Sequence, residues 1–238
     1  LGGSRARIAF LSVGVALFAL LMAKKAVNAA YFRSPGPDWI AEYSFPRPII
    51  RSWQWLDENA PPDTVVLSNS LITSIYLTGY TGVDPYLPFA QNTIASNRAV
   101  EDRFLAVHKL FGTSPERLRW LLEYRKDPTT ACDPPCSLHT AMNLSKAPAY
   151  LYGQLFNQEF NIFDSLAKSS GVSNYAIPPG VITLMVGRYR ALHPSWEDFR
   201  GTYVYVGPWE RELTPDFRVN PALELLYDRD GVAIYRVR

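Results

Sequence analysis

The sequence predicts an α/β protein in which a single N-terminal transmembrane helix is followed by a small layered α/β domain that ends in a β-hairpin. Three observations predict this class. An uncharged run of 16 residues extends from Ile8 to Ala23. An amphipathic segment at 48–59 is followed by a turn and a short apolar strand at 64–68. Two apolar segments, 223–227 and 232–237, flank the turn sequence Asp-Arg-Asp-Gly.

Composition excludes a wholly disordered chain. Of the 238 residues, 47% are hydrophobic and 13% aromatic, while only 19% are charged. Chains that stay disordered are poor in apolar residues and rich in charge. The length suits one soluble domain with an appendage.

The positive charge belongs to the N-terminal region. Residues 1–33 carry five basic residues and no acid, whereas the whole chain has 24 basic and 22 acidic residues. The other 205 residues therefore hold 19 basic and 22 acidic residues, a net charge of −3. A protein that binds nucleic acid usually carries a basic surface, so we expect no nucleic-acid partner.

We interpret the run from Ile8 to Ala23 as a membrane helix whose partners are the lipid bilayer and other transmembrane helices or subunits. As a helix it spans roughly 24 Å, and extension to Ala30 would cover the ~30 Å hydrocarbon core. A cleaved signal peptide ending near Val27-Asn28-Ala29 is the main alternative. A buried core helix is disfavoured by Gly14 and by the absence of a polar face.

The predicted organisation has three parts: a transmembrane helix with basic flanks at 1–30, a membrane-proximal linker at 31–47, and a soluble α/β domain at 48–238. Basic residues flank the helix on both sides, so charge alone does not orient it. The chain begins with Leu1 rather than Met, and we expect a processed product, a misassigned start or the tail of a longer polypeptide.

Within the soluble domain, hydrophobic spacing predicts further helices at 70–80, 97–111 and 150–169. Gly112 is expected to end the second of these, and Ser114-Pro115-Glu116 to begin another. Segments 81–88 and 127–148 are predicted loops. Strands are predicted at 181–186 and 203–206.

Two cysteines, Cys132 and Cys136, lie in a proline-constrained segment. Outside the cytoplasm they are candidates for a small disulfide, and two unpaired thiols are the alternative. His139 adds a metal-like spacing, but structural zinc needs four ligands and a fourth is not evident. We therefore predict no metal and no cofactor.

Candidate ligand-binding residues follow the first strand: Asn69, Tyr76, Tyr80, Asp84 and Tyr86. Ligands often bind at the carboxyl ends of strands in open α/β sheets, and aromatic rings with a few polar groups suit a sugar. An ordinary loop with packed tyrosines is the alternative. No nucleophile elbow, phosphate-binding loop or dinucleotide fingerprint is present in the sequence, so catalytic residues are unknown.

The stretch from Trp55 to Ser68 (WLDENAPPDTVVLS) resembles the W-L-x-x-N-x-P-x-D-x-V-V-L-S pattern that opens the C-terminal soluble domain of many prokaryotic glycosyltransferase-C-type multi-pass membrane proteins. Further matching pieces follow in order: YLTGYTG at 76–82, LFG at 110–112, YVYVGPWER at 203–211, and the closing hairpin at 223–238. The resemblance covers most of 48–238.

The resemblance implies a domain that follows the last transmembrane helix and lies outside the cytoplasm. Members of this mannosyltransferase-like family use a polyprenyl-phosphate-linked sugar, and their catalytic acids lie in loops between early transmembrane helices. Those helices are not in this sequence, so transferase activity would need further sequence or a partner. The expected role is to cap the membrane part and assist binding of an acceptor, a glycan or a lipid-linked sugar. The alternative is a non-enzymatic single-span accessory subunit that acts through protein–protein contacts.

Overall fold

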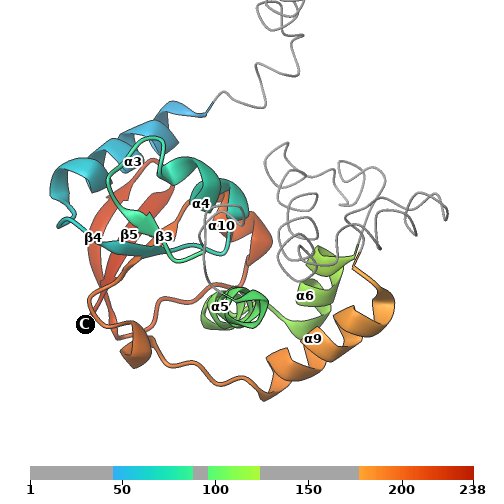
Figure 1. Ribbon diagram of the computed structural model, residues 1–238. Coiled ribbons are helices and arrows are strands. Elements are labelled where there is room, and N and C mark those ends of the chain that lie inside the picture. The colour runs from blue at the N-terminus through green and yellow to red at the C-terminus, as the bar shows by residue number, and fades with distance from the viewer. Residues whose placement is uncertain (1–44, 88–95, 124–176) are drawn as a thin grey trace, which may run out of the picture. The chain divides into compact units, whose positions relative to one another are not determined.

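The computed structural model describes residues 45–87, 96–123 and 177–238 (Figure 1). All of them except Phe45 belong to one compact unit, Pro46–Arg238. Within these ranges no helix has the length and apolarity needed to cross a membrane. Several predictions lie outside the described residues: the run from Ile8 to Ala23, almost all of the linker, the loop at 127–148, the helix at 150–169, and Cys132 and Cys136.

A five-stranded mixed sheet forms the centre of this unit, in the order β2-β1-β3-β5-β4. Strand β1 pairs in parallel with β2 and with β3, whereas β5 is antiparallel to both β3 and β4. The strands are β1 (Val65–Leu67), β2 (Asp84–Pro85), β3 (Tyr203–Val206), β4 (Leu223–Arg229) and β5 (Val232–Val237). The predicted α/β class is therefore confirmed for the described domain.

Helices accompany the strands along the chain. They are α3 (Arg47–Asn59), α4 (Leu71–Leu77), α5 (Asn97–Leu110), α6 (Pro115–Leu122), α9 (Pro179–Ala191), the 3₁₀ helix η3 (Trp196–Phe199) and α10 (Pro208–Leu213). Serine side chains cap α4, α5 and α6, where Ser70, Ser96 and Ser114 each accept a hydrogen bond from the backbone N–H three residues on. The predicted start at Ser114 is confirmed. Gly112, at φ +79°, follows α5 as predicted.

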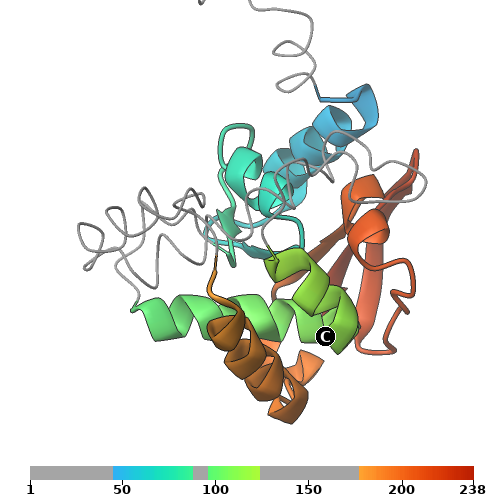
Figure 2. The ribbon, with the colours of Figure 1, turned by 90° about the vertical axis from the view of Figure 1, so that its right-hand side faces the viewer.

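The sheet has a hydrophobic layer on each face because successive residues of a strand point to opposite sides. Val204 and Val206 of β3 join the core that contains Phe104 of α5 and Met185 of α9. Tyr205 points the other way, and its hydroxyl lies 2.9 Å from Ser52 Oγ of α3. Figures 1 and 2 accordingly show α3 on one side of the sheet and α5 and α9 on the other.

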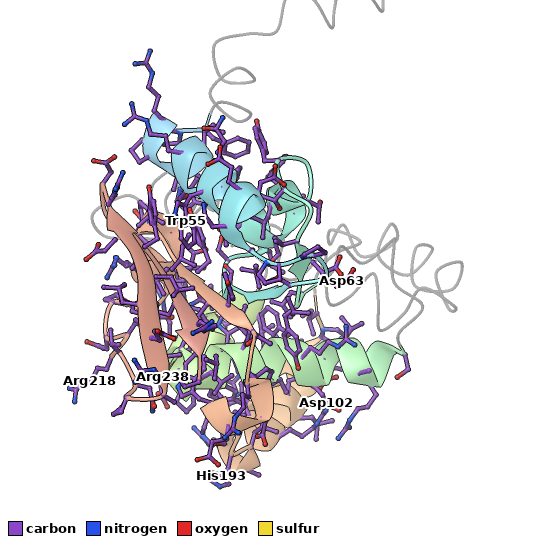
Figure 3. All side chains as sticks on the ribbon, turned by 90° about the vertical axis from the view of Figure 1, so that its left-hand side faces the viewer. Trp55, Asp63, Asp102, His193, Arg218 and Arg238 are labelled. Atoms are coloured by element: carbon purple, nitrogen blue, oxygen red, sulfur yellow. The ribbon has the colours of Figure 1, made fainter. Side chains whose placement is uncertain are left out.

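The contact between α3 and the hairpin is aromatic. Trp55 projects from α3 toward β4 (Figure 3), and its ring centroid lies 5.3 Å from that of Tyr227. The predicted hairpin is confirmed, with Arg229 opposite Val232 in the register. Asp230 and Gly231 both have positive φ, 53° and 79°. This is the left-handed pair that a two-residue hairpin turn requires.

Two predictions of secondary structure are wrong. The segment 181–186, predicted as a strand, lies inside α9. The buried residues of α9, Ile182, Met185, Val186 and Tyr189, recur at three- and four-residue spacing, as a helix requires. The prediction failed because a short apolar run in the sequence is compatible with either a strand or a buried helix. The loop predicted at 81–88 contains β2, whose two residues add a parallel edge to β1. A pairing this short leaves no periodic pattern in the sequence.

The left-handed turn allows a test with paired glycine variants. We expect Gly231→Ala to lower the free energy of unfolding by about 1 kcal/mol, because a Cβ is strained at φ +79°. Gly187→Ala in α9 is the matched control. A Cβ there meets nothing within 4 Å, and alanine favours a helix over glycine by roughly 0.5–1 kcal/mol. Urea denaturation measures both, and equal effects would contradict the turn geometry.

Candidate functional site

The carboxyl ends of β1 and β3 meet at the centre of the sheet. From β1 the chain passes through α4 to β2 on one side, and from β3 it passes through α10 to the hairpin on the other. Ligands of open α/β sheets commonly bind where neighbouring strands lead away in opposite directions. The segments that follow these strands, Ser68-Asn69-Ser70 and Gly207-Pro208, therefore outline the candidate site.

A buried carboxyl group fills this position. Glu210, in the first turn of α10, has no exposed surface. Its Oε1 accepts hydrogen bonds from Ser68 Oγ at 2.6 Å and Thr73 Oγ1 at 2.5 Å. Its Oε2 accepts one from the Gly207 backbone N–H at 2.9 Å. We call these four residues the Glu210 clamp, which joins the end of β1 to the first turns of α4 and α10.

Burial raises the pKa of Glu210 above its ordinary value. Desolvation disfavours the charged form of a carboxyl group. The hydrogen bonds from Ser68, Thr73 and the Gly207 backbone act in the opposite direction, because they favour the ionised form. Burial is the larger effect.

Position 207 favours glycine because a side chain would not fit there, not because of its backbone conformation. Its φ of −99° is accessible to any residue. A Cβ at this position, however, would lie 3.0 Å from both Glu210 Oε2 and Tyr205 Cε1. The missing side chain thus leaves room for the carboxyl group to reach the Gly207 N–H.

A series of hydrogen bonds between side chains lies beside the clamp. Asn69 Nδ2 donates to Thr214 Oγ1 at 2.6 Å, and that oxygen lies 3.3 Å from Thr113 Oγ1. Thr113 Oγ1 in turn lies 3.0 Å from His108 Nδ1. Asn69 Oδ1 is buried and has no hydrogen-bond partner within the described part of the chain. These hydrogen bonds link the end of β1 to the carboxyl ends of α5 and α10.

His108 is a neutral core residue in this arrangement. It is buried, and its ring centroid lies 4.4 Å from that of Phe104. Burial lowers the pKa of His108 to about 3, so the imidazole carries no charge at neutral pH.

The five predicted ligand-binding residues face different neighbours. Asn69 is buried against Thr214, and Tyr76 is half-buried on α4. Tyr80 is exposed and lies against Trp53, with 5.0 Å between the ring centroids. Asp84 is exposed on β2.

Tyr86 is half-buried between Phe199, at 5.3 Å between ring centroids, and Arg103, whose guanidinium carbon lies 5.6 Å from its ring. Tyr80 and Tyr86 thus face different elements, and their role in ligand binding stays a prediction.

Sequence reasoning did not single out Glu210, Thr73 or Thr214. One local signal pointed to Glu210, because a glutamate three residues after an N-cap is a capping-box arrangement. Its long-range partners had no such signal. Within residues 45–87, 96–123 and 177–238, no three His, Cys, Asp or Glu side chains lie close enough together to hold a metal ion.

Comparison of the chain with known protein families, curated proteins and solved structures finds no match. Its functional interpretation therefore depends on the residues and the geometry described above.

The clamp predicts a strong effect on stability. We expect Glu210→Ala to lower the free energy of unfolding by about 3 kcal/mol or more, because it creates a cavity and leaves buried donors unpaired. Glu212→Ala is the control, since Glu212 lies on the same helix with its side chain exposed. Urea denaturation should separate the two variants, and similar losses would show that the clamp does not stabilise the fold.

Because His108 is buried in its neutral form, we expect the free energy of unfolding to decrease in acid. The unfolded histidine titrates near 6.5 and the folded one at about 3. Between these values only the unfolded chain binds the proton, so stability falls as the pH drops, by up to about 1.4 kcal/mol per pH unit. Unfolding of the wild type and of His108→Asn should be measured from about pH 7 to about pH 4, with the variant losing less.

Glu210 affects both proteins in that experiment alike. Its raised pKa acts with the opposite sign, because stability falls as the pH rises through the ordinary value of 4.5. This contribution cancels when the two pH profiles are subtracted. Parallel profiles would contradict the buried neutral state of His108.

Proposed function

We propose that this chain is the membrane-anchored, extracytoplasmic domain of a glycosyltransferase-C-like integral membrane protein. Its role is to cap the membrane part and to assist binding of an acceptor or glycan. In this proposal the chain contributes no catalytic centre, and any transferase chemistry occurs in membrane helices that are not part of this sequence.

The Glu210 clamp is the observation that carries the proposal. It occupies the point of the sheet where an α/β enzyme commonly places its ligand. The hydroxyls of Ser68 and Thr73 bond to the carboxyl group of Glu210. Their hydrogen bonds hold strands and helices together, which supports a scaffold role for this position.

The clamp also joins two of the motifs that carry the family resemblance. Ser68 is the last residue of the stretch that begins at Trp55, and Glu210 belongs to the YVYVGPWER segment at 203–211. The two residues are 142 positions apart and share a hydrogen bond of 2.6 Å. A structural reason for both motifs supports the proposal that they mark a common scaffold.

Anchoring is proposed from the uncharged run that extends from Ile8 to Ala23. Its basic flanks suit the two interfaces of a bilayer. The extracytoplasmic side follows from the resemblance, because charge does not orient the helix.

The mass of the native protein tests this proposal. The protein should be extracted in mild detergent, its intact mass determined and its N-terminus sequenced. A polypeptide far larger than 26.8 kDa, with several spans before this domain, is the expected result. A mass that matches this chain alone would overturn the proposal and favour the single-span accessory subunit. Co-purification with other membrane proteins would then identify its partners.

A further inference from the structure

Tyr80 differs from the other aromatic residues of the domain in its exposure. Its relative exposure is 42%, and it is the only Trp, Tyr or Phe in the described ranges whose side chain counts as exposed. It lies in the turn that follows α4, where its backbone N–H donates to Leu77 O at 3.0 Å. Part of the Tyr80 ring is therefore accessible to a ligand.

The Tyr80 ring is supported from below. It rests on Trp53 of α3, with 5.0 Å between ring centroids and 44° between the ring planes. Trp53 is fully buried, and its ring also packs edge-on against that of Trp209, with 6.3 Å between the ring centroids. The exposed ring is thus held by a rigid layer, which reduces the conformational entropy that a ligand would have to remove on binding.

An exposed carboxylate is bonded to the turn that carries Tyr80. Asp57 is exposed and lies one helical turn after the buried Trp53 on α3, so the two positions are neighbours along the helix. Asp57 Oδ1 accepts a hydrogen bond from the Gly82 N–H at 2.9 Å, which ties the turn that carries Tyr80 to α3. A carboxylate offers about four acceptor positions, so Asp57 keeps capacity for further donors.

This combination suits the two chemical features of a pyranose ring. One face of such a sugar presents C–H groups that pack on an aromatic ring, and its hydroxyls donate hydrogen bonds to a carboxylate. The charge of Asp57 and of the adjacent exposed Glu58 disfavours an anionic ligand. Recognition of a quaternary ammonium group typically uses a cage of several aromatic rings, whereas stacking on a sugar uses one.

We propose that Tyr80 and Asp57 form a binding patch for a neutral saccharide. This inference rests on the proposed role in acceptor or glycan binding, and it assigns that role to a surface formed by α3 and the turn after α4. Sequence reasoning had selected Tyr80 but not Asp57, which becomes part of the patch through its bond to Gly82.

The test uses the full chain in phospholipid nanodiscs, which avoid sugar-headed detergents. Saturation-transfer difference NMR should be recorded with four probes: mannohexaose, maltohexaose, cellohexaose and chitohexaose. We expect at least one to show transfer to its ring C–H protons. Tyr80→Phe should retain the signal because it keeps the ring, whereas Tyr80→Ala should weaken binding about tenfold. Asp57→Asn should also weaken it, because the amide lacks the charge that strengthens hydroxyl hydrogen bonds.

Two control variants remove similar groups elsewhere. Leu184→Ala shortens an exposed apolar side chain on α9, and Asp228→Asn neutralises an exposed carboxylate on β4. Both should bind as the wild type does, and thermal melts should show that all variants are folded. The absence of transfer to every probe would overturn the proposal. So would a signal that Tyr80→Ala and Asp57→Asn leave unchanged. Tetramethylammonium, recorded in the same way as a cationic comparison, should show no transfer that depends on Tyr80, and a response to it alone would also overturn the proposal.

This outcome is separable from that of the mass measurement. A large native polypeptide without saccharide binding would leave the proposed function standing and remove this patch. Saccharide binding by a chain of 26.8 kDa would instead establish the patch on a single-span protein.

Discussion

The fold depends on one buried carboxyl group that holds three elements together. Glu210 receives hydrogen bonds from the end of β1, the first turn of α4 and the start of α10. β1 and α4 follow each other along the chain, whereas Glu210 of α10 lies 142 positions after Ser68 and 137 after Thr73. The two parts of the chain must meet at the strand ends in the centre of the sheet. Burying a carboxyl group is costly unless its oxygens are satisfied, so the arrangement is stable only when all of these partners are in place. The clamp therefore favours the one arrangement of these elements in which every partner is present, and it stabilises that arrangement.

Other buried polar side chains also form hydrogen bonds between elements of the fold. Asn69, beside Ser68, bonds to Thr214, and the chain continues through Thr113 to His108. On the other face of the sheet, Tyr205 contacts Ser52 of α3. The Asn69 and Tyr205 contacts link the end of β1 and strand β3 to helices, whereas the Thr113 contacts link the ends of α5 and α10. Most buried polar groups in folded proteins have such partners. The helices are therefore positioned by directional bonds in addition to apolar packing.

This use of polar residues separates the scaffold from the surface that we propose binds a ligand. Residues that looked chemically capable in the sequence, such as Asn69, are committed to internal bonds. Tyr80 and Asp57 are both exposed; the Tyr80 ring packs on Trp53, and Asp57 accepts a hydrogen bond from Gly82 in the same turn. A ligand there would not have to break the buried hydrogen bonds around Glu210.

The sequence by itself determined the elements whose signals are local. The amphipathic spacing of α3 and α5, the serine at the start of α6 and the Asp-Gly turn of the hairpin all specify structure within a few residues. Tertiary structure decided what local patterns leave open. Segment 181–186 became helix because its apolar residues meet the core at helical spacing, and β2 formed because β1 offered a parallel edge. The partners of Glu210 and the contact between Asp57 and Gly82 were likewise decided there, since residues far apart in sequence carry no local signal that they will meet.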